Sequence, residues 1–234
     1  FFHFILFVVI TALAQRWKRW HTTQKWLAFI LFLSIWYHDP LFAGQVYTST
    51  WIFPFIESVL ALAFIFGFLL YLLIFFHSLF KAPADRTFFG FYLSKIVLVG
   101  VTYVCSNVLI VWSRLFNSAD PARYSISEVP GYMYLQWVVI GLLVLYGIDL
   151  AYYVLKALGV IRKMKTKYSN RFWIVASFSI LVVLSFLGIL ITESGFRYSS
   201  QALGFLVSHT IIYLYFAVLS ILFLPGLKED ARPV

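Results

Sequence analysis

Charged residues are scarce in this chain of 234 residues: they make up 12% of it, whereas a soluble domain carries about 25%. Hydrophobic residues make up 62%, and the mean hydropathy is +0.91. One water-soluble core cannot bury that many apolar side chains, so we expect the chain to lie in a lipid bilayer. The strands of a membrane barrel alternate apolar and polar residues over about ten positions. This chain instead has long unbroken apolar runs, which predict α-helices whose backbone groups pair within each helix.

Cysteine and the common catalytic motifs are equally scarce. Cys105 is the single cysteine, which excludes a disulfide framework, and we interpret it as a small buried apolar residue. The sequence has no HExxH, no GxSxG and no glycine-rich phosphate loop, and no carboxylate pair at a spacing useful for acid–base chemistry. We therefore expect no enzymatic activity, no metal site and no cofactor.

Seven apolar segments are candidates to cross a bilayer, which takes about 20 residues per helix. Pro54 falls in the first turn of the third segment, where proline is tolerated, and Pro225 follows the last segment. We predict an all-α membrane protein, a seven-transmembrane helix bundle with receptor-like topology over residues 1–225, and a tail at 226–234. The predicted helices span about residues 1–14, 26–46, 51–80, 88–112, 132–158, 172–192 and 201–224.

Lysine and arginine are distributed unevenly between the two sides of this bundle. One side holds only Arg114, Arg123 and Arg197. The other side holds Arg16, Lys18, Arg19, Lys25, Lys81, Arg86, Lys156, Arg162, Lys163, Lys165, Lys167, Arg171, Lys228 and Arg232. Because cytoplasmic loops carry the excess of basic residues, we expect a lumenal or extracellular N-terminus and a cytosolic C-terminus.

The net charge of +9 does not indicate nucleic-acid binding, because the basic residues flank helix ends, where anionic lipid headgroups lie. Membrane lipids are therefore the expected partners. The densest cytosolic cluster is interpreted first as a determinant of topology, and alternatively as a site for acidic lipid or a trafficking adaptor. It consists of Arg162, Lys163, Lys165 and Lys167.

Glu57, Lys95 and Asp149 are formal charges inside predicted helices, where a charge is costly and usually faces the bundle interior, a partner or water. Glu57 is expected near the lumenal face, and Lys95 and Asp149 near the cytosolic face, at depths that allow an ion pair between them. This pair either locks the bundle or lines a polar cavity. His209 lies in the middle of the last helix, as a packing residue or as part of such a cavity.

Seven helices with an outside N-terminus also suggest a rhodopsin-like receptor. The third helix, however, ends in Phe76-His77-Ser78 without an acidic-Arg-aromatic switch, and the last helix ends in Phe223-Leu224-Pro225 without Asn-Pro-x-x-Tyr. A G-protein-coupled receptor is therefore the least favoured reading.

Four places in the sequence resemble the seven-helix core of the Wntless-type proteins, in the GOLD-domain seven-transmembrane family. They are the basic aromatic turn Arg16-Trp-Lys-Arg-Trp, the stretch from Asp39-Pro-Leu-Phe through the aromatic run at 51–56 to Glu57, the start of the fourth helix at 91–100 with Lys95, and the end of the last helix from Tyr213-Leu-Tyr to Pro225. Their order along the chain carries the resemblance.

The resemblance implies a lumenal β-sandwich upstream of residue 1, a location in Golgi, endosomes or plasma membrane, and a role in secretory trafficking. Wntless proteins carry lipid-modified Wnt, and the helical core of the family has a cavity, open sideways to the bilayer, that can hold a lipid or acyl chain. By position, Glu57 and Lys95 match the embedded acid and lysine of the family. Asp149 and His209 are added from their depth alone.

Two main hypotheses follow. The first is a trafficking or cargo-receptor protein whose cavity holds a phospholipid or acyl chain, with a lipidated or secretory protein as cargo. The second is an ion channel or transporter lined by Glu57, Lys95 and Asp149. The sequence leaves open the cargo and the oligomeric state.

Overall fold

The computed structural model describes residues 5, 8, 22–37, 47, 52–81, 85–119, 126, 129–162, 172–177, 179–180, 182, 210–212 and 214–219. The described residues form helices and turns and include no strand. Three of their helices are long and apolar enough to cross a membrane, over Phe55–Ser78, Phe88–Ser113 and Pro130–Ile161. The predicted all-helical membrane class is therefore confirmed, whereas the predicted count of seven spans extends beyond the described residues.

Each long helix begins or ends where its sequence dictates. Helix α4 (Ile52–Ser78) has Pro54 in its first turn, where no intrahelical donor is needed, and α6 (Pro130–Ile161) has proline at its first position for the same reason. Helix α5 (Ser94–Ala119) continues past the predicted end at 112. It ends shortly before Pro121, which disfavours helical backbone at the preceding residue.

Helix α5 is preceded by a feature that the sequence pattern did not predict, the π-helix η3 (Phe88–Leu93). The backbone of Thr87 is extended at φ −69° and ψ 151°, and its hydroxyl accepts a hydrogen bond from the Gly90 amide at 3.3 Å. Thr87 thus caps the first turn. A π-helix adds a residue to each hydrogen-bonded ring and is frequently found at functional sites.

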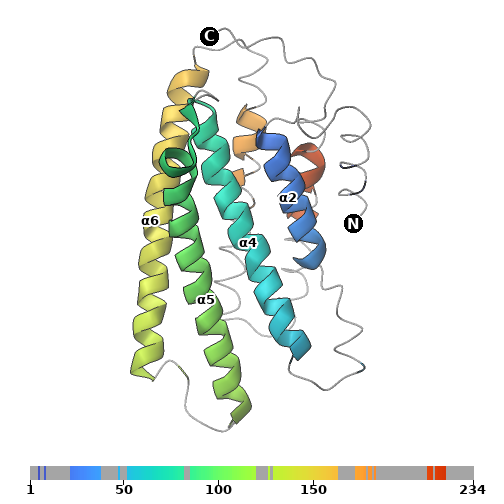
Figure 1. Ribbon diagram of the computed structural model, residues 1–234, viewed down its shortest axis with the longest axis vertical. Coiled ribbons are helices and arrows are strands. Elements are labelled where there is room, and N and C mark those ends of the chain that lie inside the picture. Colours follow the sequence, from blue (N-terminus) through green and yellow to red (C-terminus); the bar gives the residue numbers. More distant parts are fainter. Residues whose placement is uncertain are drawn as a thin grey trace. The chain divides into compact units, whose positions relative to one another are not determined.

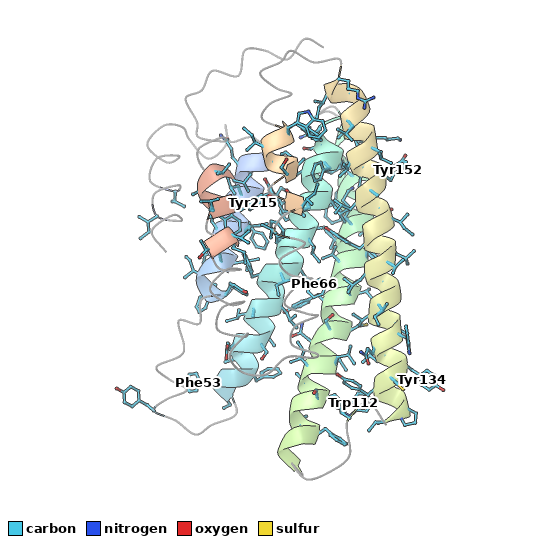
Figure 2. All side chains as sticks on the ribbon, turned by 180° about the vertical axis from the view of Figure 1, so that it is seen from behind. Phe53, Phe66, Trp112, Tyr134, Tyr152 and Tyr215 are labelled. Atoms are coloured by element: carbon cyan, nitrogen blue, oxygen red, sulfur yellow. The ribbon has the colours of Figure 1, made fainter. Side chains whose placement is uncertain are left out.

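Within residues 32–160, which form one compact unit, α4, α5 and α6 run side by side (Figure 1). Their shared core contains Phe66, Leu73, Val99 and Tyr146; Figure 2 labels Phe66. Neighbouring helices run antiparallel: the end of α4 lies beside the starts of η3 and α5, and the end of α5 lies beside the start of α6.

Two tyrosines tie these helices together through backbone carbonyls. Tyr146 of α6 donates to the Leu69 carbonyl of α4 at 3.1 Å, and Tyr103 of α5 donates to the Val59 carbonyl of α4 at 3.3 Å. At the far end, the Trp112 ring lies 3.0 Å from the position that a Cβ on Gly131 would occupy. A glycine at 131 therefore lets α5 and α6 approach each other closely.

Helix α2 spans Thr22–Tyr37, and its C-terminal part, from Phe32, also belongs to this unit. The Tyr37 ring packs on Phe64 of α4, with 4.6 Å between the ring centroids. The other unit comprises residues 1–31 and 161–234. Its described part includes a hydrogen bond of 3.0 Å between the buried hydroxyls of Ser179 and Tyr215, and a short apolar helix at Thr210–Leu219.

Candidate functional site

A groove of about 520 Å³ lies between α4 and α5, toward the start of α4. We refer to it as the α4–α5 groove. Its volume falls within the range of ligand pockets, about 300–1,000 Å³. Its lining is almost wholly apolar and consists of Phe55, Val59, Tyr103, Val104, Asn107, Val108, Val111, Trp112 and Leu115. The described lining residues include no charged group, and their composition suits a hydrocarbon chain rather than an ion.

Helical spacing explains how the sequence makes this groove. Phe55 and Val59 are four residues apart on α4, as are Val104 and Val108 on α5, so each pair lies on one face of its helix. Val104 and Val108 have small side chains and are about half exposed, which leaves the space open. Asn107 donates through Nδ2 to the Tyr103 carbonyl at 2.9 Å, and its amide is the most polar group in the lining.

A second cluster gathers at the opposite end of α4, around the turn into η3 and α5. We call it the basic aromatic cluster. It consists of His77, Phe80, Lys81, Arg86, Phe91, Lys95, Tyr153 and Lys156. The sequence analysis singled out only Lys95 among them as a candidate for function.

His77 is the centre of the aromatic packing in this cluster. Its ring stacks on Tyr153 at 4.6 Å and 13°, and lies 4.4 Å from the Phe91 ring. The imidazole thus joins α4, η3 and α6. Its Nδ1 is buried and has no hydrogen-bond partner among the described residues. Leaving a buried polar atom without a hydrogen bond costs free energy, so such an atom suggests a bound water or ion or a functional role.

Lys95 is 1% exposed, although it carries a charge. Its ammonium donates to the Phe91 carbonyl one turn earlier and lies over two rings, 4.5 Å from the Phe91 centroid and 5.1 Å from that of Tyr153. Cations are attracted to the faces of aromatic rings in this range. The ring contacts therefore replace the carboxylate that a buried lysine usually requires.

The expected ion pair between Lys95 and Asp149 is not formed, since their charged atoms are more than 4.0 Å apart. Asp149 is half-buried on α6 and attracts Lys95 only at longer range. The Lys95 ammonium instead donates to the Phe91 carbonyl of η3 and lies 5.1 Å from the ring centroid of Tyr153 on α6.

Glu57 is half-buried in the second turn of α4. It stands about 200° around the helix from Phe55, so it lies on the face opposite the α4–α5 groove. Twenty residues, about 30 Å of helix, separate it from His77 and the basic aromatic cluster. The structure therefore brings Lys95 and Asp149 to one end of the unit and leaves Glu57 at the other.

The remaining predicted site residues are only partly described. Arg162 is exposed just after the end of α6. Lys163, Lys165, Lys167 and His209 lie outside the described residues. Among the described residues, no group of histidines, cysteines and acids could hold a metal ion.

Arg86 holds the turn at this end in place. Its guanidinium donates to the Ser78 carbonyl at 2.7 Å, and through Nε and Nη2 to the Lys81 carbonyl at 3.1 and 3.0 Å. Carbonyls at the end of an α-helix lack intrahelical donors and carry partial negative charge. Arg86 therefore caps α4 and keeps its own charge beside Phe91, 5.8 Å from the ring centroid.

Comparison with known proteins places the chain in a family. The human protein Transmembrane protein 181 is 27% identical over 127 residues, which is 52% of this chain and 26% of that protein. The chain thus spans about a quarter of the length of this relative. No solved structure matches. The family model for the Wntless-like transmembrane domain matches residues 1–227, nearly the whole sequence, and the chain therefore belongs to the Wntless-like transmembrane domain family.

Proposed function

We propose that this protein acts in secretory-pathway trafficking as a cargo or lipid receptor, and that the α4–α5 groove holds an acyl chain. The observation that carries the proposal is the groove itself, with about 520 Å³ of space and a lining without charge. Membership of the Wntless-like family supports the trafficking role. Golgi, endosome or plasma membrane is the proposed location.

The energetics of the groove favour a chain that comes from outside the bilayer core. A lipid tail already in the bilayer gains little from moving into an apolar groove, because lipid tails are as apolar as leucine. An acyl chain on a lumenal cargo gains about 0.8 kcal/mol for each methylene removed from water. A lipidated protein is therefore the occupant that the groove would hold most strongly. In the purified protein, a co-purified lipid serves as its stand-in, because its tail makes the same apolar contacts with the groove.

Native mass spectrometry tests the proposal on protein purified in mild detergent. The variant Val108→Trp should fill the groove and weaken lipid binding by about four- to fifteenfold, because each methylene that loses its contact is worth about 0.8 kcal/mol and we expect one or two to be lost. The control is Val144→Trp on the exposed face of α6, which adds the same ring away from the groove and should leave bound lipid unchanged.

Two outcomes would count against an acyl-chain groove. One is full lipid retention in Val108→Trp, and the other is equal loss in the control variant. An ion conductance in proteoliposomes that is abolished by Glu57→Gln would instead favour the channel hypothesis. The distribution of Glu57 and Lys95 over opposite ends of α4 gives that hypothesis no direct support.

A further inference from the structure

The basic aromatic cluster holds three ammonium groups without a carboxylate partner. Lys81, Lys95 and Lys156 form no ion pair with any described residue, and each instead lies over an aromatic ring. Lys81 approaches the Phe91 ring at 5.8 Å, and Lys156 approaches the Tyr152 ring at 4.5 Å. Ring contacts attract a cation but leave its net charge uncompensated. The cluster therefore presents positive charge that an anion could neutralise.

Acids near the cluster do not cancel this charge. Asp85 is exposed in the turn and forms no ion pair with the described residues, and Asp149 acts on Lys95 only at longer range. Arg86 adds a fourth cation beside Phe91. Among the described residues, the three lysines thus have only these two carboxylates nearby, and the buried Nδ1 of His77 adds a polar atom without a described partner.

Apolar surface adjoins these cations. Phe88 and Phe89 in the first turn of η3 are 56% and 77% exposed, and their rings pack edge to face at 5.6 Å. They stand at the start of a helix that is long and apolar enough to cross a membrane, and the ends of such a helix meet the headgroup region of a bilayer. A soluble anion would bind only the cations and gain nothing from the exposed phenyl rings. An anionic phospholipid would gain from both, through its phosphate and its acyl chains.

We propose that the basic aromatic cluster is a binding site for an anionic phospholipid. In this site, Lys81 and Lys156 contact the lipid phosphate, and Lys95 and Arg86 add positive charge nearby. Phe88 and Phe89 pack against the acyl carbons closest to the headgroup. Each lysine near a membrane surface contributes about 1 kcal/mol to the attraction of anionic lipid. This site is separate from the α4–α5 groove, so either proposal can fail alone.

A lipid competition experiment tests the site on the full chain in mild detergent. Native mass spectrometry compares dioleoyl phosphatidylglycerol with dioleoyl phosphatidylcholine, which carry the same acyl chains. The natural sequence should prefer the anionic lipid, and Lys81→Gln with Lys156→Gln should reduce that preference by about thirtyfold, because the two contributions multiply. Lys156 is exposed and Lys81 half-buried, so this variant should fold; Lys156→Gln alone, with a smaller expected loss, provides a second test.

The control removes one charge elsewhere, to match the single variant Lys156→Gln. Lys25 is an exposed basic residue outside the cluster, and Lys25→Gln should leave the lipid preference unchanged. Equal binding of the two lipids by the natural sequence would overturn the proposal, as would equal losses in Lys156→Gln and Lys25→Gln. The variant Val108→Trp should keep the preference, because it alters only the groove.

A second comparison separates a lipid from a free organic phosphate. We expect sn-glycerol 1-phosphate, the soluble headgroup, not to displace phosphatidylglycerol, and we expect Phe88→Ser with Phe89→Ser to weaken lipid binding. Displacement by the soluble phosphate, together with an unchanged affinity in the phenylalanine variant, would overturn the lipid assignment.

Discussion

Lys95 shows how a charged side chain can be buried without an ion pair. Its stem crosses an apolar interior, and its ammonium ends between one carbonyl and two ring faces. Removing the charge removes these attractions but also removes the cost of desolvating an ammonium group. The packing of the stem therefore contributes more to stability than the charge does.

This balance predicts a difference between two substitutions of Lys95. Lys95→Met keeps the length of the stem and should change the free energy of unfolding by less than about 1 kcal/mol. Lys95→Ala leaves a cavity among Phe91, Tyr153 and neighbouring residues and should cost about 2–4 kcal/mol. Thermal unfolding in detergent measures both, with exposed Lys25→Ala as the control. An equal loss in the Met and Ala variants would show that the charge itself dominates.

The sequence predicted some of the residues at this end of the unit but not their arrangement. Lys95 and Asp149 stood out because a charge inside an apolar run is conspicuous. His77, Phe91 and Tyr153 did not, because aromatic residues occur throughout the helices and only packing brings these rings together. The α4–α5 groove was equally hidden, since it depends on which faces of two helices meet.

At the scale of the helices, α4 to α6 are joined by hydrogen bonds that cross between them. Tyr146 and Tyr103 each donate to a carbonyl of α4. Those carbonyls also accept bonds within their own helix, so each tyrosine adds a second bond to an acceptor with two lone pairs. The two hydroxyls therefore fix the separation of the helices without disturbing α4.

Conservative removal of these hydroxyls should have a modest and unequal effect. Tyr146→Phe loses a bond of 3.1 Å and should cost about 0.6–1 kcal/mol, the usual range for a bond between membrane helices. Tyr103→Phe loses a longer bond of 3.3 Å and should cost less. Unfolding of the two variants in parallel checks the order, and a larger loss in Tyr103→Phe would contradict it.

Apolar length and proline position explain where the long helices α4 and α6 begin. Pro54 and Pro130 lie in the first turns of α4 and α6. The extension of α5 from 112 to Ala119 was not predicted, because Arg114 and Asn117 look like loop residues although nothing before Pro121 stops the helix. The π-helix at Phe88–Leu93 was also not predicted, since apolar periodicity over six residues does not distinguish a π turn from an α turn.

At the scale of the whole molecule, the uneven distribution of basic residues predicts which side of the membrane each turn faces. Cys105 is replaced by alanine to provide a background without thiols. In sealed microsomes, whose cytosolic side faces outward, Asp85→Cys should react with a membrane-impermeant maleimide. Tyr47→Cys, at a residue that is 87% exposed, should react only after detergent is added, because it precedes α4 on the other side. The reverse labelling pattern would invert the topology.

The distance between the α4–α5 groove and the basic aromatic cluster has a consequence for the lipids around the protein. Val59 and His77 are 18 residues apart on α4, or about 27 Å of helix, which is close to the thickness of the hydrocarbon core, about 30 Å. In the proposed orientation the two sites would therefore lie in opposite leaflets. An acyl chain in the groove and an anionic lipid at the cluster would then be separate molecules, and a change in the anionic lipid of one leaflet would alter the occupancy of the cluster without altering that of the groove.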